Sequence, residues 1–238
     1  MHTTTMYRFV TTHHHVTVLL CLTALALGPA CSSDSDGGGA STPDASGDGE
    51  AGSGFDVLTD LGPIGVDLQS AACEDAAYEL PACASPTLVP GPEAWVATHV
   101  TLPTPISYDD EPPSSGAHRP EWARWGEYDY LPPQRWLHNC EHGGIALLHH
   151  PCAPASVRDA LHAWAKAQPR DGDGGDFRWV LTPYPGLKTA AAAVAWNVRL
   201  EMTCVEDDAL DAFKADHYRK ASEDVAAHGG YDYGWLGD

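Results

Sequence analysis

The stretch from Cys31 to Gly54 contains no leucine, isoleucine, valine or aromatic residue, and this gap limits the fold more than any other feature of the chain. Its residues are mainly serine, aspartate, glycine, alanine, threonine and proline. A segment of this composition has too little apolar surface to bury and stays disordered. We therefore expect a flexible linker over residues 31–60 and a globular domain over residues 61–238, with a core at about residues 93–222.

The residues before this linker have the pattern of an export signal. Val16 to Leu27 is an apolar run of 12 residues, which suits the apolar region of a signal peptide and is too short to span a bilayer. Cys31 then follows the sequence Leu-Gly-Pro-Ala, which resembles a bacterial lipobox. We expect residues 1–30 to be a signal peptide and Cys31 to carry a lipid; the alternative is an ordinary signal peptide that is cut nearby.

This pattern predicts an exported protein of the bacterial cell envelope, anchored to the membrane through Cys31 and facing the periplasm or the cell surface. The charge balance limits its other partners, because 13 Lys and Arg stand against 33 Asp and Glu, for a formal net charge of −20. Such an acidic chain repels phosphate groups, so we expect no nucleic-acid partner. The sequence does not identify a protein partner.

Five cysteines remain when Cys21, inside the apolar run, and Cys31 are set aside. Export allows disulfides, and an odd number leaves at least one thiol unpaired within the chain. The disulfide candidates are Cys73, Cys83, Cys152 and Cys204. Their positions favour a local bridge between the first two and a long-range bridge between the last two, although other pairings fit as well. Under this assignment Cys140 stays free.

The patterning after residue 61 mixes helices and strands. Helical spacing or composition predicts helices over residues 68–80, 157–167, 189–196 and 207–221, with Ser156 as the N-cap of the second. Apolar runs and loose alternation predict strands over residues 94–102, 144–149, 179–181 and 197–205. Because the two kinds of element are interleaved, we expect a single domain of the α+β or α/β class.

Four histidines stand in short motifs whose other residues either have reactive side chains or restrict the backbone conformation. His99 lies in a predicted strand, and His118 ends a Pro-Pro-Ser-Ser-Gly-Ala-His segment. His138 and His142 bracket Asn-Cys-Glu and are followed by two glycines. Residues four apart lie on one side of a helix and also on one side of a strand, so these last two histidines can share a metal ion.

The four histidines therefore predict a site for a Zn or Cu ion, since imidazole suits both metals. Whether residues 138–142 form a strand or a helix decides which other side chain can join the histidines as a ligand. On a strand, Cys140 would face the same side as His138 and could be an extra ligand, whereas on a helix Glu141 would lie near His138. The alternative interpretation is four structural histidines without a metal.

The motif at residues 138–142 also fits H-x-x-E-H, in which a helix presents two zinc ligands and a general base. Two prolines precede it and two glycines follow it, which is poor context for the long helix of such enzymes. A metal-dependent hydrolase with Glu141 as base is therefore our second hypothesis. The third is a non-enzymatic envelope interaction module, and the sequence leaves open whether the protein is an enzyme.

Six short segments occur in a fixed order along the chain: His99-Val100, Tyr108, Pro112 to His118, Gly126 to Tyr128, His138 to Gly143 and Ala195-Trp196. They resemble the bacterial DUF3105 family, with a pattern of the type HV…Y…PPTSGPH…GxY…HxLEHG, and the resemblance extends from His99 to Phe213. The family pattern has leucine at Cys140, which argues against a required cysteine ligand. Many members resemble exported, membrane-anchored proteins, and the family implies no established activity, so its histidines are candidate positions only.

Overall fold

A computed structural model describes residues 81–92 and 97–238 of the chain. The predicted signal peptide, the lipidation site Cys31, the linker, Cys73 and the predicted helix at residues 68–80 all lie outside the described residues. Part of the predicted strand at residues 94–102 lies outside them as well.

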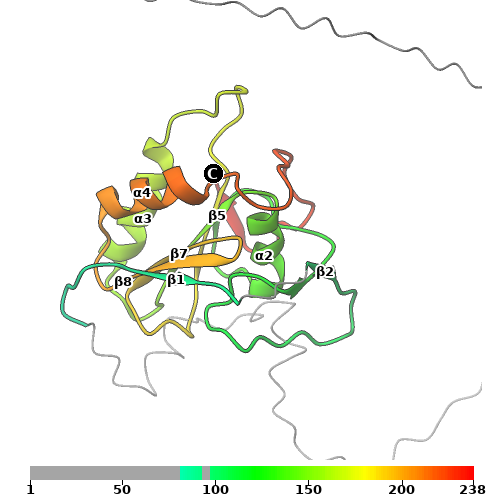
Figure 1. The fold of residues 1–238 in the computed structure, drawn as a ribbon, viewed down its shortest axis with the longest axis horizontal. Helices are drawn as coiled ribbons and strands as arrows, with labels where there is room; N and C mark the ends of the chain where they lie inside the picture. The colour runs from blue at the N-terminus through cyan, green and yellow to red at the C-terminus, as the bar shows by residue number, and fades with distance from the viewer. Residues whose placement is uncertain (1–80, 93–96) are drawn as a thin grey trace, which may run out of the picture. The chain divides into compact units, whose positions relative to one another are not determined.

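A mixed seven-stranded sheet organises the described part of the chain (Figure 1). Its strands are β1 (Thr87–Pro90), β4 (Gly126–Tyr128), β5 (Ile145–His149), β6 (Trp179–Pro183), β7 (Ala191–Ala195), β8 (Val198–Met202) and β9 (Trp235–Gly237). The strand order is β1-β8-β7-β5-β6-β4-β9. β6 is parallel to both of its neighbours, β5 and β4, and every other pair is antiparallel.

Helices cover both faces of this sheet. The helices are α2 (Pro133–Glu141), α3 (Ala155–Ala167) and α4 (Asp207–His217). Alternate residues of β5 show the two layers: Ile145 and Leu147 share a core with α3 and α4, whereas Ala146 and Leu148 share a second core with α2. Because both faces are covered, the central strands are apolar runs rather than alternating ones.

A second, two-stranded sheet lies beside α2. It consists of β2 (Thr98–His99) and β3 (Ala117–His118), which run parallel to each other. The helices and mixed sheets confirm a single domain of the α+β class. They also confirm the predicted strands at 144–149, 179–181 and 197–205 and the predicted helices at 157–167 and 207–221, with boundaries a few residues different. The first of these helices, α3, begins at Ala155 without a side-chain cap, so the assignment of Ser156 as its N-cap is wrong.

The predicted helix at residues 189–196 is also wrong, because these residues form β7. Alanine has the highest intrinsic helix propensity, but tertiary pairing overrides propensity. β7 lies between β5 and β8, and all five of its residues are buried. It joins β8 through a two-residue turn in which Asn197 has a φ of 65°, a left-handed conformation that asparagine tolerates well in hairpins.

The disulfide pattern differs from the predicted one. Cys83 is bonded to Cys204, so the local bridge from Cys83 to Cys73 and the bridge from Cys204 to Cys152 are both wrong. Strand pairing explains the result: Cys83 precedes β1 and Cys204 follows β8, and the antiparallel register of these strands brings the two together. Cys152 is disulfide-bonded too. Cys140 is free and buried, as predicted.

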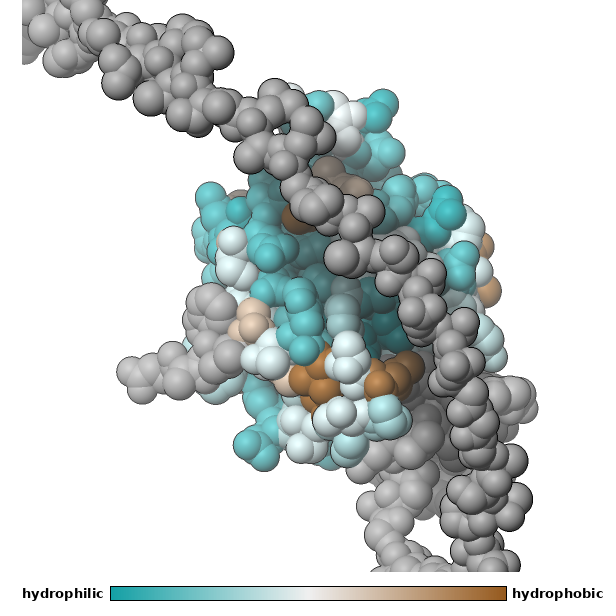
Figure 2. Space-filling model, turned by 90° about the vertical axis from the view of Figure 1, so that its right-hand side faces the viewer, coloured by the Kyte–Doolittle hydropathy of each residue, from teal (hydrophilic) through white to brown (hydrophobic). Residues whose placement is uncertain are grey.

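The described part of the face drawn in Figure 2 is mainly hydrophilic, with hydrophobic residues in a few small areas. The large exposed apolar side chains include Leu88 on β1 and Leu236 on β9. These two strands form opposite edges of the sheet, so the two leucines do not share a patch. Among the described residues, no helix is long and apolar enough to cross a membrane.

The disulfide gives the first testable prediction. A bridge across 121 residues of sequence removes much of the conformational freedom of the unfolded chain and contributes about 2–4 kcal/mol to stability. We expect the double variant Cys83→Ser/Cys204→Ser to lose this amount in urea unfolding monitored by circular dichroism. The single variant Cys83→Ser should add one titratable thiol to the unfolded protein, because Cys204 loses its partner; a thiol count that falls by one would show that Cys83 is not paired.

Candidate metal centre

The small parallel sheet places two of the predicted histidines side by side. The register of β2 and β3 sets His99 opposite His118, and the Val100 amide donates to the His118 carbonyl at 2.8 Å. The guanidinium of Arg119 donates to the carbonyls of Val100 and Thr104 at 3.1 and 2.8 Å. The chain that follows His99 is thereby held against β3.

Helix α2 supplies a third imidazole and a carboxylate. Pro133 occupies its first turn, where a missing amide proton costs nothing. His138 and Glu141 are three residues apart and so lie on the same side of the helix. The helix ends at Glu141, and Gly143, with a φ of 84°, then reverses the chain in a conformation that favours glycine.

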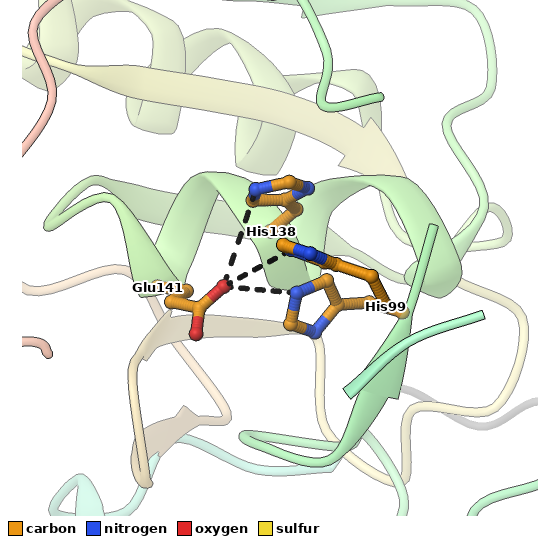
Figure 3. A group of neighbouring side chains, drawn as sticks. His99, His138 and Glu141 are labelled. Atoms are coloured by element: carbon orange, nitrogen blue, oxygen red, sulfur yellow. Dashed lines mark ion pairs between the residues drawn. The ribbon is translucent and has the colours of Figure 1, made fainter. Parts of the chain in front are cut away.

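Three imidazole nitrogens surround one carboxylate oxygen. Figure 3 shows His99 and His138 directed toward Glu141. The Oε2 atom of Glu141 is 3.7 Å from Nε2 of His99, 2.9 Å from Nε2 of His118 and 4.0 Å from Nε2 of His138. One donor atom from each of the four residues lies within 4.8 Å of all the others. Donors about 2.0–2.1 Å from a tetrahedral ion are about 3.3 Å apart, so the group has the right size for one transition-metal ion.

The two buried imidazoles are fixed by backbone carbonyls. Nδ1 of His118 is 2.8 Å from the carbonyl oxygen of Gly116, and Nδ1 of His138 is 2.7 Å from that of Arg119. A carbonyl oxygen only accepts, so each Nδ1 carries the proton and donates it. The lone pair of each Nε2 is then directed toward the group, as in metal-ligating histidines.

Two polar atoms face each other at the centre of the group. Nε2 of His118 and Oε2 of Glu141 are both buried and are 2.9 Å apart. In a neutral His118 with its proton on Nδ1, both atoms are acceptors, and two buried acceptors that face each other are unfavourable. A second proton on His118 removes this penalty, and so does a metal ion bound between the two atoms, so the donor set fits a metal ion.

The protonation preferences of the group also suit metal binding, which requires deprotonated ligands. Burial lowers the pKa of His138 to about 4; the hydrogen bond to the Arg119 carbonyl opposes this change, and the neighbouring imidazoles add to it. Burial alone would raise the pKa of Glu141, but the close imidazoles of His118, His138 and His99 outweigh it and lower this pKa below its usual value. His138 is therefore neutral and Glu141 ionised at neutral pH.

The segment that follows α4 makes hydrogen bonds to Glu141 and to the backbone at the end of α2. The Ser222 hydroxyl donates to Oε1 of Glu141 at 3.5 Å, and the Glu223 amide donates to the Glu141 carbonyl at 3.2 Å. The Arg219 amide donates to the carbonyl of Gly143 at 2.9 Å. These contacts satisfy carbonyls at the C-terminal end of α2 and orient the carboxylate. Sequence reasoning assigned no role to this segment, because its contacts come from residues distant along the chain.

His142 was predicted as a ligand, but the structure does not bring it into the group. Its Nε2 is 3.0 Å from Oε2 of Glu223, and its ring packs edge-on against His138 and Trp122, each at a centroid distance of 4.4 Å. The four-residue spacing does bring His142 beside His138, and the His142 amide donates to the His138 carbonyl at 3.0 Å, as in a helix. Its imidazole pairs with Glu223 instead, so its Nε2 is not one of the four gathered donor atoms.

Cys140, considered as an extra ligand on a strand, is not one. In the helix its thiol lies in the core between α2 and the sheet and donates to the Val194 carbonyl at 3.4 Å. Burial raises the pKa of this thiol to about 12. The helical alternative, with Glu141 near His138, is the one the structure adopts.

Asn139 was another residue without a predicted role. Its side chain makes two hydrogen bonds with the backbone of Ala123, accepting from the amide at 2.9 Å and donating to the carbonyl at 2.8 Å. This pair joins α2 to the segment that precedes β4. Three successive residues of α2 thus have different roles: His138 is a candidate ligand, Asn139 holds the neighbouring loop, and Cys140 packs in the core.

An α+β domain that gathers three imidazoles and one carboxylate at the end of a buried helix has the architecture of a candidate metal-binding protein. Residues 99–230 match DUF3105, a family described as protein of unknown function. This match spans more than half of the chain, which therefore belongs to the DUF3105 family and carries all four donor residues inside the matched region. No curated protein and no solved structure matches the chain.

The pKa of His138 gives a second prediction. The unfolded chain takes up a proton on this imidazole near pH 6.5, but the folded protein does so only near pH 4. The free energy of unfolding of the chelator-treated protein should therefore fall as the pH drops through this window, by on the order of 3 kcal/mol from this group. Urea unfolding at a series of pH values should show a shallower decline for His138→Gln. Parallel profiles for the two proteins would contradict the assignment.

Proposed function

We propose that this protein is an exported lipoprotein of the bacterial cell envelope whose domain binds one transition-metal ion. The ligands would be His99, His118, His138 and Glu141. The observation that carries this proposal is the convergence of their four donor atoms within 4.8 Å. The buried contact at the centre, 2.9 Å between His118 Nε2 and Glu141 Oε2, supports it further, because a metal ion can replace the proton that would otherwise lie between these two atoms.

The donor set favours a borderline transition metal over magnesium or calcium. Imidazole nitrogens suit Zn and Cu, whereas Mg²⁺ and Ca²⁺ prefer sites built from oxygen. We therefore propose Zn²⁺ or Cu²⁺ as the ion. The role would be metal handling at the envelope or a reaction that the metal assists.

A hydrolase that uses Glu141 as a general base receives less support from this geometry. In such enzymes the glutamate activates a water molecule and the two flanking histidines bind the metal. Here His142 pairs with Glu223, and Glu141 lies among the other three imidazoles. A metal-assisted reaction would instead use Glu141 as a ligand, with the metal acting as a Lewis acid.

Metal content tests the proposed site. The untagged exported chain, purified without chelator and analysed by inductively coupled plasma mass spectrometry, should hold about one Zn or Cu ion per chain. His118→Ala and Glu141→Gln should each reduce this content at least about tenfold, because they remove buried ligands. His162→Ala is the matched control: His162 lies on α3, where its ring contacts Glu127, and its loss should leave the metal content unchanged.

Circular dichroism and urea unfolding would show whether each variant is folded. Folded His118→Ala and Glu141→Gln proteins with undiminished metal would contradict the proposed ligands. Absence of metal from the wild-type protein, after reconstitution with each ion, would favour the interaction module with structural histidines.

The lipid anchor is proposed from the sequence. What supports it is the apolar run that ends shortly before Cys31 and the acidic, polar linker that follows. We expect the full chain, expressed in a bacterium, to fractionate with membranes and to be released by detergent. Cys31→Ser should move it to the soluble exported fraction, and Cys140→Ser serves as a cysteine control that leaves fractionation unchanged. Membrane association that persists in Cys31→Ser would contradict the anchor.

A further inference from the structure

The four donor residues differ sharply in exposure. The side chains of His118, His138 and Glu141 are 0%, 3% and 5% exposed, whereas that of His99 is 48% exposed. A metal held by this group would thus be shielded by protein on three sides and reached by solvent from the side of His99. Structural metal sites are closed, whereas sites that act on other molecules keep an open position.

His99 is also the least firmly held of the four. The rings of His118 and His138 are fixed at Nδ1 by backbone carbonyls. Within residues 81–92 and 97–238, the ring of His99 makes no hydrogen bond; it contacts Glu141 at 3.7 Å and packs against the other two imidazoles. Its strand β2 has two residues and pairs with β3 alone. Turning the His99 side chain away from the group therefore breaks no hydrogen bond among the described residues.

From this asymmetry we infer that the His99 position is an exchangeable coordination site, at which a small neutral nitrogen donor replaces the His99 imidazole. The inference rests on the proposed metal binding and assigns a direction of access to it. In the exchange, the bond between the metal and Nε2 of His99 breaks and a bond to the incoming nitrogen forms. No proton or electron is transferred, and the other three ligands stay in place.

The surroundings favour a neutral donor over an anion. Glu223, whose side chain is 47% exposed, pairs with His142 next to the group, and the chain as a whole carries a net charge of −20. Acidic surroundings lower the local concentration of anions. Trp122 lies against His138 at a centroid distance of 5.2 Å and offers an aromatic surface to a flat heterocycle.

Cobalt substitution and imidazole test this inference on the full chain. Visible absorption of Co²⁺ reports its coordination geometry, which differs between four and more ligands. We expect His99→Ala to bind one Co²⁺ with affinity weakened about 10–100-fold, and His118→Ala to bind none. At about pH 8, where free imidazole is neutral, added imidazole should restore the wild-type spectrum to His99→Ala, and acetate at equal concentration should not.

Each result has a definite meaning. If wild-type protein binds no Co²⁺, Zn²⁺ or Cu²⁺, the proposed metal site itself fails. If wild-type protein binds Co²⁺ but His99→Ala loses it as completely as His118→Ala, the metal site stands and the exchangeable position is wrong. Restoration by acetate as effective as that by imidazole would overturn the preference for a neutral donor.

Discussion

A buried carboxylate must be compensated, and the compensation of Glu141 connects most of this domain. An isolated ionised carboxylate is costly away from water. Here three imidazoles reach its Oε2 from β2, β3 and α2, while the segment after α4 contacts its Oε1 and its backbone carbonyl. Segments that are more than a hundred residues apart in sequence therefore meet at one side chain.

Helix α2 can hold that carboxylate in place because its other sides are fixed by different interactions. Trp136, Leu137 and Cys140 pack in the core above the sheet, and Asn139 holds the backbone of Ala123 through two hydrogen bonds. A helix of nine residues has little stability of its own. Packing on the sheet therefore supplies its order, and the close approach of Gly144 to Trp125, where a Cβ would lie 2.5 Å from the indole, fixes how the chain leaves it.

Much of the candidate site could be predicted from the sequence because its signals are local. His99, His118 and His138 stand in short motifs, and the helical alternative for residues 138–142 already placed Glu141 near His138. His142 shows the limit of a spacing argument, since the spacing places its ring beside His138 but does not show that its Nε2 pairs with Glu223. The cysteine pairing and β7 depend on which strands are neighbours. Such pairing is non-local, so it set the Cys83–Cys204 bond and overrode the helix propensity of the alanines.

The uneven exposure of the four donors bears on what such a site is for. A metal that only stabilises a fold gains from complete burial, because a closed ligand set excludes competing donors. Three donors of this group are nearly inaccessible, with their rings or carboxylate oriented by backbone and side-chain hydrogen bonds, and the fourth stands on a two-residue strand with half of its side chain in solvent. This arrangement combines firm retention of an ion with access from one direction. A metal ion that binds another molecule needs such access, so this arrangement favours a functional centre over a structural one.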